Sequence, residues 1–243
     1  MPDLATAYAD TRRSMIDLAR DADLTARVPA CPDWNVKQLI AHVTSVAGSL
    51  AGGQIPPDFD PVGSMIDEER AVIREAHIAK TLAQREHLPI EEIVKEWEES
   101  GLVVDAMIRG ERPFPDGSPP FPEWIVMTDA AIHHHDLRGA IGVPGDRDSL
   151  ATGLALRSYV EAMRFRSAAE GRPAFTLIAG PRSWVIGNGD PVATLTADPF
   201  ELSRTVSGRR SPEQIRAYDW DGDPGPVLDL FYPYGPRADE LVE

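Results

Sequence analysis

The sequence predicts an α+β fold, with a helical N-terminal part and a smaller C-terminal part that mixes strands and helices. Two observations carry this prediction. Apolar residues recur at helical spacing in successive segments up to about residue 169, which is typical of amphipathic helices. After Gly171-Arg172-Pro173, short β-rich runs are separated by Gly, Pro, Asn and Asp, which is typical of strands and turns. We therefore place two domains, residues 1–170 and residues 171–243.

The helical part begins with a predicted amphipathic helix over about 3–23. A second helix is expected to about residue 50, and its start is well marked because Asn35 can cap it and Gln38 can complete a capping box. His42 lies at the edge of the apolar face of this helix. The remaining helices of this part are expected at about 65–86, 90–110, 123–141 and 149–169.

In the C-terminal part we expect three strands arranged as a small meander. The Gly187-Asn188-Gly189-Asp190 segment has the composition of a hairpin turn. Two short helices and a possible third follow the strands. The expected strands are 175–179, 183–187 and 192–196, and the expected helices are 199–207, 212–218 and a segment near 227–231.

Composition limits the kind of partner. The 39 acidic and 24 basic residues give a net charge of -15, which argues against nucleic acid or an anionic membrane surface, because both are bound by clustered Lys and Arg. No apolar run approaches the roughly 20 residues that span a bilayer, and the N-terminus lacks the apolar core of a signal peptide. The single cysteine, Cys31, excludes an internal disulfide and fits a reducing compartment. We expect a cytoplasmic monomer or homodimer that acts on a small molecule.

The segment 128–139 contains three of the six histidines between two aspartates. On a helix, Asp129 and His133 stand one turn apart on the same face. Burying them requires partners for their polar groups, and a divalent metal would supply one, with His42 as the best third ligand from elsewhere. The alternative is that these histidines are exposed or only hydrogen-bonded. The sequence also contains no nucleotide-binding glycine loop and no G-x-S-x-G nucleophile motif.

Other polar residues of this segment have two interpretations each. His134 and His135 point about 100° and 200° around the helix from His133, and we expect at least one of them on a polar outer face. Asp136 could accept the free ring N–H of a ligating histidine, or it could form a surface ion pair with Arg138.

With these residues identified, the sequence resembles the mycothiol-dependent maleylpyruvate isomerase family of the DinB-like metal-dependent superfamily. The resemblance covers nearly the whole chain. It implies an N-terminal DinB-like four-helix bundle that holds a divalent metal, usually zinc, and a smaller C-terminal α/β domain. The segments that carry the resemblance are Val28–His42, Asp129–Ala140, Arg182–Gly187 and Ser207–Ser211.

The resemblance also implies a set of site residues. The metal ligands become His42, Asp129 and His133, with Asp136 and His134 as residues that support them or contact substrate. The family pattern has Glu where this chain has Asp129, and the carboxylate is therefore withdrawn by about 1.5 Å, which predicts a metal that sits differently, binds more weakly or is another ion. Arg209 and Arg210 are candidates for the family's substrate-binding arginine, and a structural role at a helix end is the alternative.

The activity implied is that of an isomerase or thiol transferase. It would use mycothiol, an actinobacterial low-molecular-weight thiol, as cosubstrate and act on a small electrophilic, unsaturated molecule. Which residues other than the metal ligands take part in catalysis is left open. The rival hypothesis is a metal-binding or ligand-sensing protein of the same fold that lacks catalytic turnover.

Overall fold

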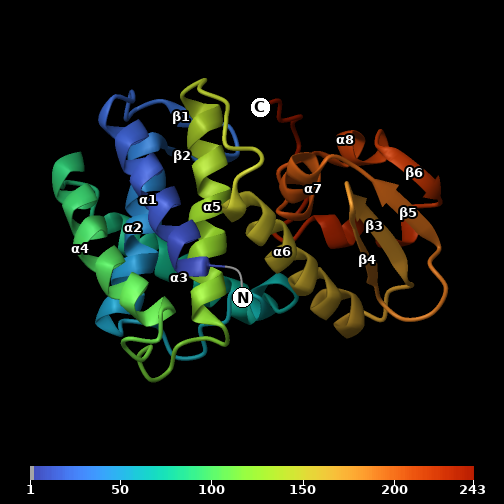
Figure 1. Ribbon diagram of the computed structural model, residues 1–243, viewed down its shortest axis with the longest axis horizontal. Coiled ribbons are helices and arrows are strands. Elements are labelled where there is room, and N and C mark those ends of the chain that lie inside the picture. Colours follow the sequence, from blue (N-terminus) through green and yellow to red (C-terminus); the bar gives the residue numbers. More distant parts are fainter. Residues whose placement is uncertain (1–2) are drawn as a thin grey trace. The chain divides into compact units, whose positions relative to one another are not determined.

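The computed structural model describes residues 3–243, and their contacts divide the chain into two compact units (Figure 1). The first unit runs to Gly145 and the second covers Asp146–Glu243. Helix α6 (Leu150–Ala169) belongs by its contacts to the second unit, where it packs against a helix and a strand. The division between units thus lies before α6, whereas the change in sequence composition near residue 171 lies after it.

The first unit is a four-helix bundle, as the sequence predicted. Helices α1 and α2 each contact both α4 and α5, and a further helix, α3, packs on α2. A 3₁₀ turn at Gly63–Met65 precedes α3. The helices of the unit are α1 (Leu4–Arg20), α2 (Val36–Gly52), α3 (Glu68–Ala83), α4 (Ile90–Ile108) and α5 (Pro122–Ala140).

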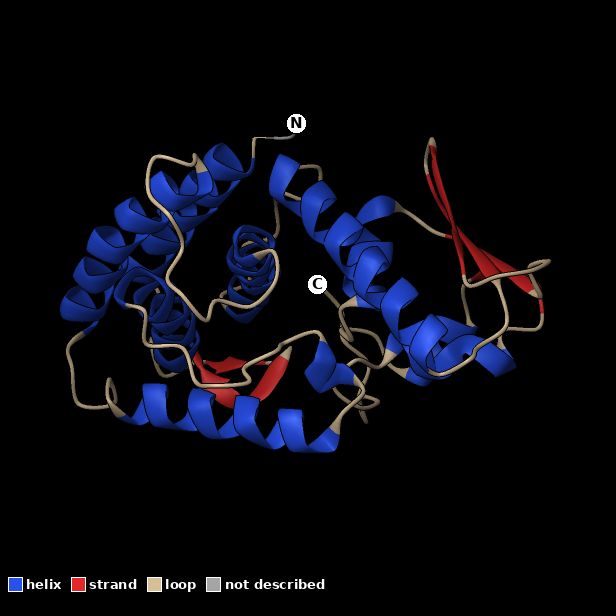
Figure 2. Ribbon diagram, turned by 90° about the horizontal axis from the view of Figure 1, so that it is seen from below, coloured by secondary structure: helices blue, strands red, loops and turns tan. Residues whose placement is uncertain are grey.

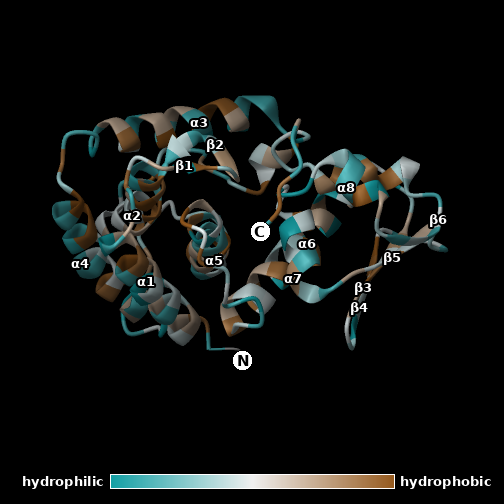
Figure 3. Ribbon diagram, turned by 90° about the horizontal axis from the view of Figure 1, so that it is seen from above, coloured by the Kyte–Doolittle hydropathy of each residue, from teal (hydrophilic) through white to brown (hydrophobic). Residues whose placement is uncertain are grey.

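Local signals in the sequence explain where these helices begin. The side chain of Asn35 accepts from the main-chain N–H of Gln38, and the Gln38 side chain accepts from that of Asn35, so the predicted capping box of α2 is confirmed. The carboxylate of Asp3 caps α1 by accepting from the main-chain N–H of Thr6. Each helix carries both hydrophobic and hydrophilic residues (Figure 3). None of the helices within residues 3–243 is long and apolar enough to cross a bilayer.

A two-stranded antiparallel pair between α1 and α2 was not expected from the sequence. Strand β1 (Arg27–Val28) pairs with β2 (Cys31–Asn35), and Val28 stands opposite Cys31. Strand β1 contacts α5, and β2 contacts α2. The pair therefore fixes the chain immediately before α2 against two helices of the bundle.

The second unit contains a four-stranded sheet in the order β4-β3-β5-β6 (Figure 2). Strands β3 and β4 form an antiparallel hairpin, but β5 runs parallel to β3. The predicted meander is therefore wrong, and the segment 187–190 is a crossover connection between strands that do not pair. A fourth strand, β6, was missed by the sequence analysis. The strands are β3 (Phe175–Ala179), β4 (Arg182–Ile186), β5 (Ala193–Thr196) and β6 (Asp219–Gly222).

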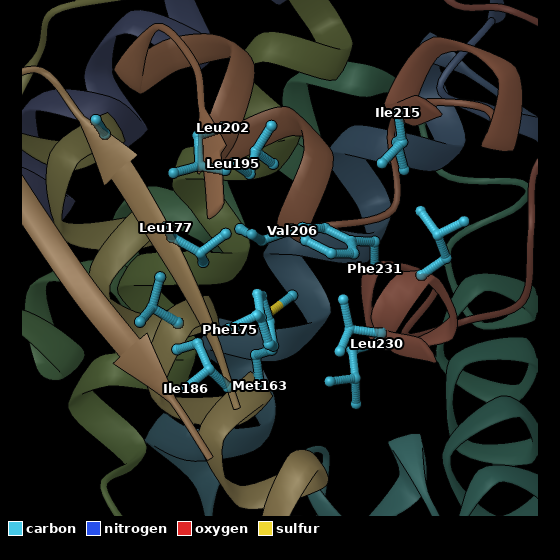
Figure 4. Close-up of a cluster of buried hydrophobic side chains, with 14 of the residues drawn as sticks. Met163, Phe175, Leu177, Ile186, Leu195, Leu202, Val206, Ile215, Leu230 and Phe231 are labelled. Carbon is cyan, nitrogen blue, oxygen red and sulfur yellow. The ribbon is translucent and has the colours of Figure 1, made fainter. Parts of the chain in front are cut away.

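Helices and the sheet of the second unit enclose one apolar core (Figure 4). Its side chains come from α6, from the strands, and from α7 (Pro199–Val206), α8 (Pro212–Arg216) and a 3₁₀ segment at Gly225–Phe231. Along β3 buried and partly buried residues alternate, so Phe175 and Leu177 point into this core. The core gives the second unit its own hydrophobic interior.

Candidate metal centre

Helix α5 places a carboxylate and an imidazole on one face of the bundle interior. Asp129 and His133 are one turn apart, and Nε2 of His133 lies 3.6 Å from Oδ1 of Asp129. The imidazole is buried, with 7% of the residue exposed, whereas 23% of the Asp129 side chain remains exposed. The carboxylate is therefore the part of this pair that faces solvent.

Helix α2 brings a second imidazole to the same carboxylate oxygen. Nε2 of His42 lies 3.2 Å from Oδ1 of Asp129, and 6% of His42 is exposed. One ligand atom each from His42, Asp129 and His133 lie within 4.8 Å of one another. The structure thus brings together the three residues that the sequence analysis selected as metal ligands.

The spacing of these atoms fits a tetrahedral ion. A zinc ion bonded at 2.0–2.1 Å holds neighbouring ligand atoms about 3.3–3.4 Å apart in tetrahedral geometry. The distances of 3.2 Å and 3.6 Å from Oδ1 of Asp129 to the two imidazole nitrogens bracket this value. Two neutral imidazoles and one carboxylate are also a donor set that divalent metals accept. These three residues therefore fit a divalent metal ion.

The second ring nitrogen of His133 is held by a buried carboxylate. Nδ1 of His133 lies 2.9 Å from Oδ2 of Asp136, which has no exposed surface. A carboxylate accepts the Nδ1–H, so Nε2 of His133 keeps its lone pair on the side of Asp129. Of the two roles that the sequence left open for Asp136, the structure shows the contact with histidine.

Comparison with known proteins shows the family of this chain. The family model of the mycothiol maleylpyruvate isomerase N-terminal domain matches residues 4–138, more than half of the chain. The chain belongs to this family. No curated protein matches the sequence.

Two solved structures share the fold of this family member. One is described as a mycothiol-dependent maleylpyruvate isomerase and the other as a variant of it with one histidine replaced by alanine. Each is 15% identical in sequence and covers 86% of this chain and 90% of its own, with TM-scores of 0.56 and 0.57. At this identity the likeness establishes the α+β fold with its DinB-like bundle.

Two residues near the candidate metal ligands were not selected as site residues from the sequence. The ring of Trp34 lies 4.8 Å from that of His42 and 5.7 Å from that of His133, measured between centroids. The thiol of Cys31 lies 3.5 Å from Oδ2 of Asp136. Both residues stand on β2. Their position depends on the β1–β2 pair, and a two-residue strand leaves no periodic pattern in a sequence.

The other two histidines of α5 are buried, with 3% of His134 and 4% of His135 exposed. The expectation of a polar outer face for at least one of them is wrong, because α5 is enclosed on nearly all sides. Nε2 of His134 lies 3.0 Å from Oγ of Ser14 and accepts from Nε of Arg138 at 3.0 Å. Ser14 also lines a cavity of about 880 Å³ beside the C-terminal ends of α1 and α5.

The imidazole of His77, on α3, packs beside α2 at Ser49, which lies further along that helix than His42. Its Nε2 is 3.4 Å from Oγ of Ser49, and its ring meets Phe59 edge-on at 5.3 Å. Burial, together with the positive charges of Lys80 and of protonated His42, lowers the pKa of His77 below its usual value. His77 therefore favours its neutral form.

Arg209 and Arg210 belong to the second unit, and both are buried. Arg210 pairs through Nε and one amino group with the carboxylate of Glu201, at 2.9 Å and 3.1 Å. Arg209 donates to the main-chain oxygen of Ser207 at 2.6 Å. These contacts stabilise the loop between α7 and α8. They correspond to the structural role that the sequence analysis left as the alternative.

Proposed function

We propose that the first unit binds one divalent metal through Nε2 of His42, Nε2 of His133 and Oδ1 of Asp129. The observation that carries this proposal is the convergence of two buried imidazole nitrogens on one carboxylate oxygen of Asp129, at 3.2 Å and 3.6 Å. Such a set suits zinc, nickel, iron and manganese alike. The tetrahedral spacing favours zinc among them.

We infer that the site serves a mycothiol-dependent isomerase or thiol transferase acting on a small unsaturated electrophile. A divalent ion held there would lower the pKa of a coordinated thiol and supply a thiolate at neutral pH. In an isomerase, the thiolate would add to the double bond and leave an enolate, the adduct would rotate about the resulting single bond, and elimination would return the thiolate and the trans product. In a transferase the enolate would take up a proton from solvent and the adduct would be released.

Residues around the candidate metal ligands would orient them and border the site. Asp136 keeps His133 in one tautomer, and the ring of Trp34 packs at a tilt beside both imidazoles. Asp129 leaves an exposed edge through which a thiol can enter. With a net charge of -15, the protein disfavours a dianionic acid. We therefore expect a less negatively charged substrate than maleylpyruvate.

The first test is metal content, measured by plasma mass spectrometry on untagged protein. We expect about one divalent ion per chain in the wild type and loss of it in His42→Ala and His133→Ala. His87→Ala is the matched control, because this histidine is exposed and outside the cluster. A wild type that stays empty after metal is supplied would contradict the proposal.

The second test separates the catalytic function from its rival. Mycothiol should raise the melting temperature of the metal-loaded protein by mass action, and it should be required for turnover of cis-unsaturated acids. Metal binding without any thiol effect would instead favour the metal-binding or ligand-sensing protein. The partly exposed Asp129 supports the catalytic reading, because it leaves the centre open.

A further inference from the structure

In the second unit, residues 241–243 lie against α7 and α8 in an alternating pattern. Leu241 is 6% exposed, Val242 is 87% exposed, and the side chain of Glu243 is again only 6% exposed. This segment belongs to no helix or strand. Side chains that alternate between buried and exposed are typical of an extended peptide bound to a protein surface.

The main chain of Leu241 is held by one side-chain amide. Nε2 of Gln214 donates to the oxygen of Leu241 at 2.9 Å, and Oε1 of Gln214 accepts from its N–H at 3.1 Å. The same Oε1 accepts from the N–H of Ser211 in the capping box of α8. Gln214 is therefore positioned by its own helix and does not depend on the segment it binds.

The carboxylate of Glu243 lies between two buried guanidinium groups. Arg204, with no exposed surface, donates to both carboxylate oxygens, from Nε at 2.7 Å and from one amino group. Arg210 donates to Oε2 at 3.1 Å. Arg147 donates to the main-chain oxygen of Glu243. A two-point contact between arginine and carboxylate is a strong and directional form of recognition.

We propose that this face of the second unit is a receptor for an acidic peptide segment, which the chain's own residues 241–243 occupy. The receptor has three parts: an apolar seat for Leu241, the Gln214 amide for the main chain, and the Arg204–Arg210 pair for the carboxylate. Gln214 is fixed by the α8 cap, and Arg210 is fixed by Glu201. These two groups are thus held in place without the segment, which lets it leave and rebind.

The experiment uses a chain shortened to end at Glu240 and a fluorescent peptide of residues 236–243. We expect one peptide to bind per shortened chain and none to bind the full chain, because its own segment fills the receptor. A Glu243→Gln peptide should bind at least about 30-fold more weakly, since it leaves a buried guanidinium without its charge partner.

Gln214→Glu in the shortened chain is the matched variant. Glutamate keeps the acceptor that caps α8, but it removes the donor to Leu241 and so should weaken peptide binding without unfolding the protein. A folded shortened chain that binds no peptide would overturn the proposal, as would equal binding of both peptides or binding by the full chain. A shortened chain that fails to fold, and that peptide does not restore on refolding, would show that the segment is a fixed part of the core and would likewise overturn it.

Discussion

Nδ1 of His133 lies 2.9 Å from Oδ2 of Asp136, and this contact determines which ring nitrogen of His133 faces Asp129. The two candidate histidines are positioned by different means. No partner within residues 3–243 hydrogen-bonds Nδ1 of His42, so packing against Trp34 and the contact with Asp129 hold that ring. The orientation of His133 therefore depends on a buried charge.

We expect Asp136→Asn to lower metal affinity by about 10-fold or more, within the 10–100-fold range typical of such supporting groups. Asparagine keeps the volume and one acceptor but removes the charge that strengthens the bond to His133. Affinity is measured by competition with a chelator of known strength. The control is Cys31→Ser, which keeps a donor toward the same carboxylate and should bind metal normally. An unchanged affinity in Asp136→Asn would show that the carboxylate does not support a metal ligand.

Asp129→Glu should weaken metal binding, although it keeps the charge and a carboxylate. Oδ1 of Asp129 already lies 3.2 Å and 3.6 Å from the two imidazole nitrogens, so an added methylene would carry the oxygen past the tetrahedral position. Zinc bonds of about 2.0–2.2 Å tolerate little displacement. We expect about a tenfold loss of affinity in the same chelator assay. Equal or tighter binding by the glutamate variant would mean that α5 lies too far from the ion for aspartate to reach it well.

Particular residues show how much of the site was predictable from the sequence. The capping box at Asn35 and Gln38 fixed the start of α2 and hence the place of His42 along that helix. The four-residue interval between Asp129 and His133 fixed their shared face on α5. Both are local signals. From the sequence His42 was only the best candidate for a third ligand, and the structure brings it against Asp129.

The parts that were missed depend on contacts between distant segments. Trp34 on β2 meets the ring of His133 on α5, which lies far along the chain. In the sheet, β5 pairs with β3 in parallel, and its short run of apolar residues would look the same in an antiparallel meander. The burial of His134 follows from contacts with Ser14 on α1, 120 residues away in the sequence, and no periodicity reports such a contact.

Arg12 and Asp105 form a buried ion pair between α1 and α4, with one amino group 2.7 Å from Oδ2. Burial raises the pKa of the neighbouring Tyr8 to about 12, so its hydroxyl stays protonated beside the pair. We expect Asp105→Ala to lower the free energy of unfolding by about 3–5 kcal/mol, because it leaves a buried guanidinium without its partner.

The double variant Arg12→Met with Asp105→Leu should recover most of that loss, since two apolar side chains replace the pair without an uncompensated charge. Urea unfolding followed by circular dichroism measures all three proteins. If the double variant is as unstable as Asp105→Ala, the loss of unfolding free energy comes from packing around α4 and not from the unpaired charge of Arg12.

Glu201 makes the stability of the second unit depend on pH. Burial favours the protonated form of Glu201 and by itself would raise its pKa. The hydrogen bonds and charge of Arg210, together with a hydrogen bond from Tyr218 and the charge of Arg147, outweigh burial and lower the pKa of Glu201 below its usual 4.5. A carboxylate with a lowered pKa in the folded state stabilises the fold above the unfolded value and loses that contribution as the pH falls through the folded value. The stabilisation from Glu201 is therefore complete at neutral pH and declines below about pH 4.5.

We expect Glu201→Gln to be less stable than the wild type at pH 7, because glutamine removes one of the two carboxylates, Glu201 and Glu243, that pair with the buried guanidinium of Arg210. As the pH falls through the lowered pKa of Glu201, the wild-type carboxyl becomes protonated as well, so the two melting temperatures should converge. Thermal unfolding of both proteins from pH 7 down to the acid limit of folding measures this difference directly. A constant gap across that range would mean that the variant acts through packing and that the charge of Glu201 contributes nothing.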